Sequence, residues 1–579
     1  MRYFIFFVLA IFFTKSYSQL TPFEISKGKE TATYHQIIEF YKILSEKNSE
    51  ITITEIGKTD IGKPLSLVKI AKVNSGFNKC KVLINNGIHP GEPEGIDASM
   101  MFARDIFNHK KLNKLLDKVD IYLIPVYNID GCLNRNSSTR ANQNGPIEYG
   151  FRGNAKNLDL NRDFIKCDSK NAELFELIFQ SIKPDLYIET HTSNGADYQY
   201  TLTYIPTQKD KLNQSQGQYF EKVMIPSIAA LTKDAGFEMT PFVNTRKVKP
   251  DDGIDGFFDN PRYSTGYASL FNTLGFMVET HMLKAFDKRV KATYTFLSAA
   301  IEIAYRDAEN IIQLHAEADS ALFYQQEFPL TWKQDTSNFE LLNFKGYKAK
   351  YIKSKISGFD RLFYDRSKPM YINVKYYNKF VPNLVIKKPA AYVIPQAYQS
   401  IIKLLQINQV EMYELTRDTT IIVECYQIDS LKTLSKPYEG HYYHSKIFTS
   451  KKTDSINYFK GDKIIITDQK SNKYLIETLE PEGNDSFMAW NFFDAILNHK
   501  EGYSDYVFED LALEILKNDP ILKADFENKK FQDKAFASNP TAQLDFIYHR
   551  SKFHEKTYNR YPVARILFEN LIPTQILSY

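Results

Sequence analysis

The chain has 579 residues, of which 25% are charged and 43% are hydrophobic, and its formal net charge is +4. This composition is that of a folded globular protein, which excludes a largely disordered chain, and the length predicts roughly two to four domains. A net charge this small for the length gives no indication of a nucleic-acid partner.

The N-terminal stretch MRYFIFFVLAIFFTKSYSQL has the pattern of a secretory signal peptide. A basic Arg2 precedes an apolar block that runs from Tyr3 to Phe13, and the small residues Ser16 and Ser18 follow the block. The block is too short to span a membrane. We therefore expect residues 1–18 to be removed, and the mature chain to be secreted or periplasmic without a transmembrane span. The alternative is that the block forms a buried N-terminal strand.

Between residues 19 and 315, short apolar runs alternate with amphipathic stretches. The runs LSLVKI, KVLINNGI, VDIYLIPVYN, DLYIETH and GFMVETHM indicate buried strands. The stretches GIDASMMFARDIF, NAELFELIFQSI and YFEKVMIPSIAALTKDA have apolar residues three and four apart, which is typical of helices. This alternation predicts an α/β domain with a largely parallel or mixed sheet. Functional sites of such sheets gather at the carboxyl ends of the strands.

The pattern changes after the stretch FLSAAIEIAYRDAENIIQLHAEADSALF, which predicts one long helix. Alternating runs such as MYINVKYY, DTTIIVECYQI and DKIIITD predict a β-rich domain over residues 316–480. The segments SFMAWNFFDAIL and FEDLALEILKNDP then predict a helical C-terminal region over residues 481–579. The chain has four scattered cysteines, which are too few for a disulfide scaffold and match no zinc-finger spacing, although they leave a single disulfide open.

The turn GIHPGEPEG places His89 and Glu92 three residues apart, directly after a predicted strand. Histidine and glutamate are typical ligands of a catalytic zinc ion, which takes about three protein ligands and keeps one position open. A third ligand must therefore come from elsewhere in the chain. His191 in DLYIETH also ends an apolar run, and His281 in GFMVETHM is its rival.

The loop RGNAKNLDLNRDF, residues 152–164, is dense in Asn, Asp and Arg. An adjacent asparagine and arginine with a further arginine offer several planar donors, which is the arrangement that recognises a carboxylate. The alternative is an ordinary solvated polar loop.

Taken in order, His-x-x-Glu, the segment PVYNIDG, the segment DLNR, a strand-ending histidine and a late strand-ending glutamate resemble the zinc carboxypeptidases of the M14 (carboxypeptidase A-like) family. The resemblance covers roughly the first 300 residues of the chain. It implies an α/β fold in which a mixed eight-stranded sheet lies between helices, with one zinc ion above the strand ends. The site residues that it implies are His89, Glu92 and His191 as zinc ligands, Glu279 as the catalytic carboxylate, Asn161 and Arg162 as the clamp on the substrate's terminal carboxylate, and Asp159 as the acid that orients His89.

Two roles stay open within the resemblance. The arginine that polarises the scissile carbonyl is Arg152 by its contiguous motif, with Arg140 as the alternative. The tyrosine that covers the substrate lies in the segment DNPRYSTGYASLFN, where Tyr267 is favoured over Tyr263.

Two positions depart from the family pattern or lack a role in it. Digestive members carry an arginine where this chain has Gly91, so an auxiliary contact to the peptide is missing. His281 stands two residues after Glu279 and has no family role. It either tunes Glu279 from the same face of the strand or caps the strand end.

These residues predict an exported zinc-dependent carboxypeptidase that hydrolyses the amide bond next to a free C-terminal carboxylate. The substrate is then a peptide or a peptide-like molecule. One alternative is an amidase that acts on peptidoglycan stem peptides or N-acyl amino acids, since the same chemistry cuts any amide beside a carboxylate. A different class, a non-catalytic secreted binding protein, is disfavoured by the complete ligand set and the presence of Glu279.

Overall fold

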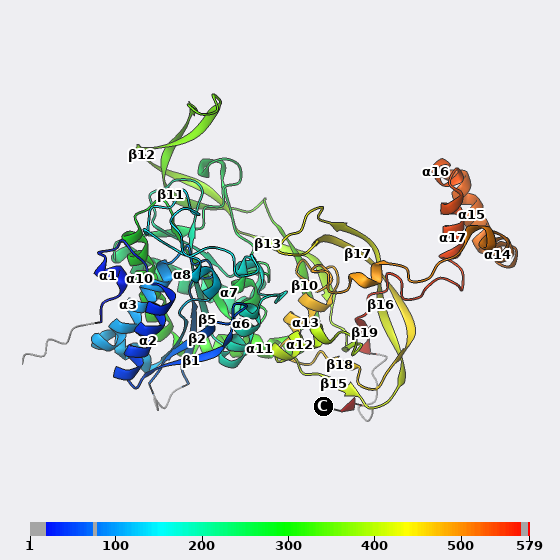
Figure 1. Ribbon diagram of the computed structural model, residues 1–579, viewed down its shortest axis with the longest axis horizontal. Helices are drawn as coiled ribbons and strands as arrows, with labels where there is room; N and C mark the ends of the chain where they lie inside the picture. Colours follow the sequence, from blue (N-terminus) through cyan, green and yellow to red (C-terminus); the bar gives the residue numbers. More distant parts are fainter. Residues whose placement is uncertain (1–18, 73–77, 569–576, 579) are drawn as a thin grey trace, which may run out of the picture. The chain divides into compact units, whose positions relative to one another are not determined.

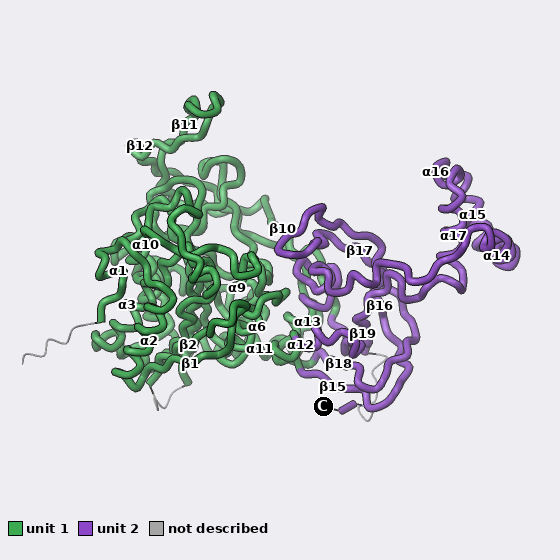
Figure 2. Tube along the Cα trace, viewed as in Figure 1, with its two compact units in different colours: residues 1–387, 404–410, 468–476 green, residues 388–403, 411–467, 477–579 purple. Residues whose placement is uncertain are grey.

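The computed structural model describes residues 19–72, 78–568 and 577–578, so the predicted signal peptide lies outside the described residues. The chain divides into two compact units (Figure 2). The first unit comprises residues 1–387, 404–410 and 468–476, and the second comprises residues 388–403, 411–467 and 477–579. Over the described part of the chain, every helix is too short or too polar to cross a bilayer.

The first unit is built on a mixed eight-stranded sheet with the strand order β1-β2-β4-β3-β5-β9-β6-β7, which confirms the predicted fold class (Figure 1). Its central strands β4, β3, β5 and β9 are parallel, and β1, β2 and β6 pair in antiparallel fashion. The strands are β1 (Ile51–Lys58), β2 (Pro64–Ile70), β3 (Cys80–Asn85), β4 (Val119–Ile124), β5 (Leu186–Ser193), β6 (Leu202–Pro206), β7 (Met239–Pro241) and β9 (Leu274–His281).

Helices flank this sheet and bury its apolar side chains. Helices α3 and α10 pack on each other and contact the sheet, while Phe175 of α6 and Tyr267 of α9 lie against the aromatic core around Tyr187 of β5. The helices of this unit are α1 (Pro22–Ile25), α2 (Tyr34–Lys47), α3 (Glu94–Asn108), α4 (Lys110–Asn113), α5 (Ile129–Leu133), α6 (Lys170–Ile182), α7 (Gln214–Tyr219), α8 (Ile225–Asp234), α9 (Ser264–Ser269), α10 (Phe286–Arg306) and α11 (Ala308–Tyr324).

The stretch predicted as one long helix is two helices, α10 and α11, and the break falls at Asp307. Asp307 leaves the helical conformation, with φ −110° and ψ 19°. Its carboxylate accepts hydrogen bonds from Tyr219 and from the side chain of Arg306. These side-chain hydrogen bonds hold Asp307 in place, and aspartate has a low intrinsic preference for the interior of a helix.

The segment expected as one β-rich domain contributes strands to both units. Two antiparallel strand pairs belong to the first unit, and the longer pair, a hairpin, also contacts the short strand β8 (Ile254–Asp255). Their strands are β10 (Glu327–Gln334) with β13 (Phe380–Lys387), and β11 (Glu340–Lys353) with β12 (Asp360–Tyr377).

The second unit contains a seven-stranded sheet and a group of helices. Its strand order is β17-β16-β19-β14-β18-β15-β20. The strands are β14 (Ala391–Ile394), β15 (Tyr413–Leu415), β16 (Thr419–Thr433), β17 (His444–Tyr458), β18 (Lys463–Ile466), β19 (Ala564–Ile566) and β20 (Leu577–Ser578). The helices are α14 (Asp505–Asn518), α15 (Pro520–Gln532), α16 (Lys534–Ala537) and α17 (Pro540–Tyr548), while α12 (Gln399–Ile407) and α13 (Asn472–Leu479) contain residues of both units.

Two further details bear on the sequence-based expectations. The segment SFMAWNFFDAIL is a series of turns that ends in a short 3-10 helix (Asp494–Leu497). Its consecutive residues Phe487, Met488, Ala489 and Trp490 are all fully buried, which a surface helix with one apolar face does not allow. The four cysteines are all free thiols, so the disulfide that the sequence left open is not formed.

Candidate metal centre

The parallel order of β3, β5 and β9 brings three polar residues to one edge of the sheet. His191 of β5 pairs in register with Glu279 of β9, so their side chains project from adjacent strands at the same level. His89 follows β3, the other neighbour of β5. The carboxyl ends of parallel strands lie together, and this explains why residues far apart in the sequence converge.

A tight turn presents His89 and Glu92 in the same direction. The backbone N–H of Glu92 donates to the carbonyl of His89 at 2.8 Å, and α3 starts two residues later. The approach to the turn needs a glycine at position 87, where φ is +66° and a Cβ would lie 3.0 Å from Val126. The backbone N–H of Thr192 holds the Glu92 carboxylate at 2.9 Å from the far side.

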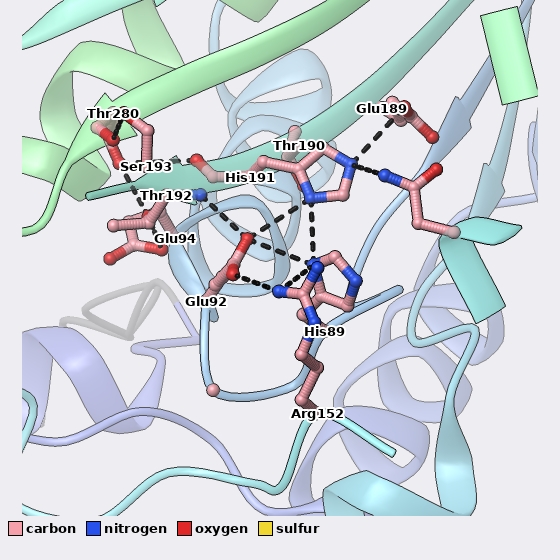
Figure 3. A network of polar contacts seen from close by, with 12 residues as sticks. His89, Glu92, Glu94, Arg152, Glu189, Thr190, His191, Thr192, Ser193 and Thr280 are labelled. Carbon is pink, nitrogen blue, oxygen red and sulfur yellow. Dashed lines mark hydrogen bonds and ion pairs between the residues drawn. The ribbon is translucent and has the colours of Figure 1, made fainter. Parts of the chain in front are cut away.

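His89, Glu92 and His191 form a buried triangle of ligand atoms (Figure 3). His89 Nδ1 and His191 Nδ1 are 3.2 Å apart, and Glu92 Oε2 lies 3.3 Å and 3.2 Å from them. Ligands bound to zinc at about 2.0–2.1 Å in a tetrahedral arrangement stand roughly 3.3–3.4 Å apart. The two imidazoles and the carboxylate therefore fit a zinc ion without rearrangement.

The outer nitrogens of both histidines face acids, which fixes how the rings are presented. Figure 3 shows Glu189 beside His191. His89 Nε2 donates to Asp159 Oδ1 at 2.8 Å, so the Nδ1 lone pair points into the triangle. His191 Nε2 lies 3.3 Å from Glu189 Oε1. Such acids orient metal-bound imidazoles and raise their basicity. Burial lowers the pKa of His191, but Glu189 and Glu92 outweigh it and raise that pKa well above its usual value, so the site favours a cation.

Two arginines border the triangle. Arg140 donates to Glu92 Oε1 at 2.7 Å and is itself held by Gln143 and by the carbonyl of Thr192. Arg152 donates to Asp159 Oδ2 at 2.9 Å, while its other terminal nitrogen lies 3.3 Å from both Glu92 Oε1 and His89 Nδ1. Burial opposes ionisation of Glu92, but Arg140 and His89 hold its pKa well below the usual range. Both arginine candidates thus reach the site.

Gly91 makes room for Arg140. A Cβ at position 91 would lie 2.8 Å from Arg140 Cδ and 3.0 Å from the carbonyl oxygen of Gly150. An arginine at position 91 would therefore collide with the one already there. Arg140, which comes from a different part of the sequence, therefore fills the space beside Gly91 that an arginine at position 91 would need.

Glu279 lines the same cavity as the triangle, together with Asn161, Arg162 and both arginines described above. Its Oε2 atom is buried and accepts no hydrogen bond from any residue that the structure describes. Burial raises the pKa of Glu279 to about 8, although His191 and Arg152 lower it, and the negative charges of Glu92 and Glu189 act in the same direction as burial. A carboxylate with a raised pKa beside a candidate metal site is typical of a general base.

Asn161, Arg162 and Tyr263 form the wall of the cavity next to the triangle. Asn161 Nδ2 is 3.5 Å from His191 Nε2, and the guanidinium of Arg162 lies over the ring of Tyr263 with 4.6 Å to the ring centroid. Arg162 also donates to the carbonyl of Asn161 at 2.7 Å. The ring contact and the hydrogen bond hold the Arg162 guanidinium in place, and this group remains accessible from the cavity.

The prediction that Tyr267 covers the substrate is wrong. Tyr267 is fully buried, packs between Phe175 and Phe179, and donates its hydroxyl hydrogen to Asn408 at 2.6 Å. It lies within helix α9, whose inner face turns toward α6, whereas Tyr263 caps the N-terminus of that helix and lines the cavity. Tyr263 is therefore the tyrosine that can reach a substrate.

His281, the rival third ligand, caps the strand end. It is fully buried, its Nε2 donates to the carbonyl of Ala196 at 2.9 Å, and its Nδ1 accepts from the backbone of Leu283. Burial lowers the pKa of His281 to about 4. Both ring nitrogens are therefore engaged with backbone, and none is left for a metal or for Glu279.

Sequence reasoning missed Glu189, which is fully buried beside His191. The signal was present in the run YIETH, because residues two apart in a strand project from the same face. Glu189 is held by Tyr187 of the same run and by Ser264 of α9, and the local pattern of the run gives no signal for Ser264.

Comparison with known proteins gives a consistent result. Residues 37–211 match the family model Peptidase_M14, zinc carboxypeptidase. Carboxypeptidase 2 of Trichophyton rubrum is 23% identical over 492 residues, which cover 80% of this chain and 85% of that protein. Human carboxypeptidase O is 31% identical over 139 residues, which cover 23% of this chain and 37% of that protein. A metallo-carboxypeptidase from Burkholderia cenocepacia aligns with 48% of this chain and 70% of its own, at 17% identity and a TM-score of 0.38.

Proposed function

Since this chain carries an M14 zinc carboxypeptidase domain and is a metallocarboxypeptidase, we propose that it removes the C-terminal residue of peptides at the cavity around His89, Glu92 and His191. The observation that carries the proposal is the convergence of three buried ligand atoms, a carboxylate and a cationic clamp in one cavity. The N-terminal pattern further supports export of the chain to a secreted or periplasmic location, and residues 19–315 are proposed as its catalytic region.

Each group at the cavity has a role in this proposal. His89, Glu92 and His191 hold one zinc ion, which supplies Lewis-acid activation of water and of the scissile carbonyl when bound. Glu279 accepts a proton from the attacking water and delivers it to the leaving nitrogen. Arg152 stabilises the negative charge that develops on the carbonyl oxygen.

Arg152 is preferred to Arg140 for this last role because of what each side chain touches. Arg140 is held by Glu92, Gln143 and a backbone carbonyl, which leaves it little freedom to meet a substrate. Arg152 is more exposed, with 44% of its side chain accessible against 15% for Arg140. Arg152 also acts on Glu279 electrostatically. Arg140 accordingly positions Glu92.

The clamp predicts that a free C-terminal carboxylate is required. Arg162 and Asn161 offer charge-assisted and neutral donors at the wall of the cavity. We expect Arg162→Ala to lower kcat/KM for free peptides by about 10- to 100-fold, since a hydrogen bond to a charged group contributes about 1.5–3 kcal/mol. The same substitution should barely change the low turnover of C-terminally amidated peptides.

Arg361→Ala is the matched control, because Arg361 is an exposed arginine on β12 outside the cavity. Equal turnover of amidated and free peptides by the wild-type chain would remove the clamp role from Arg162. The same kinetics on N-acyl amino acids and on peptidoglycan stem peptides separate the peptidase from the amidase alternative. We expect kcat/KM to be highest for ordinary peptides. A higher kcat/KM for either of the other two substrate classes would favour the amidase.

The apolar part of the cavity indicates which terminal side chain fits. Ile205, Phe242, Phe257 and Met277 line it, and Met277 stands two residues before Glu279 on the same face of β9. An apolar pocket rejects a charged side chain because that charge would be buried without a partner.

We therefore expect peptides that end in Phe or Leu to be cleaved at least about 10-fold faster than those that end in Lys or Glu, as measured by kcat/KM. Met277→Ala should lower kcat/KM for Phe-terminated peptides and leave that for Ala-terminated peptides unchanged. Faster cleavage of Lys- or Glu-terminated peptides would show that the apolar residues do not form the specificity pocket.

A further inference from the structure

A second cluster of histidines lies in the other unit, far along the sequence from the catalytic residues. We propose that His499, His549 and His554 bind a second zinc ion that closes the base of the α14–α17 helical segment. The three side chains each present a ring nitrogen, and these nitrogens all lie within 4.8 Å of one another. They account for three of the chain's 11 histidines, which are otherwise scattered.

The spacing of the rings matches that of a metal-ligating pair. The ring centroids of the three histidines are 5.2, 5.6 and 4.9 Å apart. The corresponding distance between His89 and His191 is 5.0 Å. Imidazole nitrogens bind zinc at about 2.0–2.1 Å, so small side-chain rotations bring the three nitrogens onto one ion. A set of three imidazoles suits zinc and leaves a fourth position for water.

One ring nitrogen of the cluster lacks a hydrogen-bond partner among the described residues. His554 Nε2 is buried and has no such partner, although a buried imidazole nitrogen normally has one. An ion bound at the cluster would supply that partner.

The surroundings hold the cluster in place before any ion binds. The Tyr558 ring stacks on His499 with 3.5 Å between the centroids. Glu555 Oε1 accepts the backbone N–H of Lys500 at 2.7 Å, which ties the segment of His499 to the segment of His554. Glu555 Oε2 lies 4.0 Å from His499 Nδ1 and is the carboxylate that offsets the positive charge of an ion. A site with preset ligands loses less entropy on binding.

The position of the cluster in the chain indicates its purpose. His499 precedes α14, which starts at Asp505, and His549 directly follows α17, which ends at Tyr548. One ion bound to all three would connect both ends of the helical segment. Closing a loop of this length removes chain entropy from the unfolded state, and the metal's binding energy then adds to the stability of the fold.

The test counts zinc on the full-length chain. The protein is stripped with chelator, reloaded with zinc chloride, freed of unbound metal by gel filtration, and measured by mass spectrometry of the metal. We expect two zinc ions per wild-type chain, one per chain in His549→Ala/His554→Ala, and two in His35→Ala, which replaces an exposed histidine outside both clusters. Peptidase activity should be unchanged in the double variant, which shows that its first unit is folded, and its circular dichroism spectrum should match that of the wild type.

One zinc ion per wild-type chain, or two in the double variant, would overturn the proposal. If the double variant fails to fold, the single variant His499→Ala replaces it, since His499 is exposed and its loss leaves no buried gap. Limited proteolysis gives an independent reading. Zinc should slow cleavage around residues 499–504 and 549–556 at least several-fold in the wild type and not in the variant, and equal cleavage in both would contradict the closing role.

Discussion

Replacing Glu279 with Gln is expected to leave zinc bound and to lower kcat by about 10²- to 10⁴-fold, which is the range that general acid–base catalysis contributes. Glutamine keeps the shape of the side chain but can neither accept the proton of the attacking water nor return it to the leaving nitrogen. The carboxylate faces the cavity that the proposed zinc ligands line, and its Oε2 atom has no hydrogen-bond partner among the described residues. The loss should therefore fall on turnover, with KM nearly unchanged.

The measurement combines steady-state kinetics on a free peptide with the zinc content of the same sample. Glu317→Gln is the matched control, because Glu317 is an exposed glutamate on α11 away from the cavity. If Glu279→Gln turned over at the wild-type rate, Glu279 would not be the base. If it lost zinc as well, the carboxylate would be a ligand and not a proton carrier.

Much of the candidate site could be predicted because its residues follow strands. His89, His191 and Glu279 each follow or end an apolar run, and parallel strands bring such ends together. The sequence does not encode how a side chain on a short helix points. Tyr263 and Tyr267 are four residues apart in one segment, and only the start of α9 between them decides that one faces the cavity and the other the core.

Contacts between distant segments also could not be predicted from the sequence. The hydroxyl of Tyr267 donates a hydrogen bond to Asn408, which is 141 residues away, and no local sequence pattern indicates that partner. The sequence alone indicates that an arginine is missing at Gly91, whereas in the structure Arg140 lies beside that position and comes from another loop. The boundary at residue 315 was placed by a change of pattern, but strands β10–β13 stay with the first unit because they pair within it. Local periodicity reports strand character and not the partner that the strand will take.

Removing the metal is the second change with a large expected effect. Stripping the chain with a chelator, or replacing His89 with Ala, should abolish measurable peptide hydrolysis, because the three ligand atoms and the proposed chemistry depend on one ion. Added zinc should restore the stripped wild type and not the His89→Ala chain. Activity that survived in a chain shown to be free of metal would contradict the proposed mechanism.

The acids behind the two histidines allow a finer version of the same experiment. Asp159→Asn and Glu189→Gln each remove the acid behind one ring without touching a ligand atom, and such partners typically contribute about 10- to 100-fold in metal affinity. We expect both variants to be inactive at low zinc and to regain most of their turnover at saturating zinc. His89→Ala and Glu279→Gln should not recover when zinc is added. Asp159→Asn should regain less, because Asp159 also holds Arg152 at 2.9 Å, and that arginine then no longer points at the carbonyl oxygen. Identical recovery in the two variants would show that Asp159 does not position Arg152 for its role.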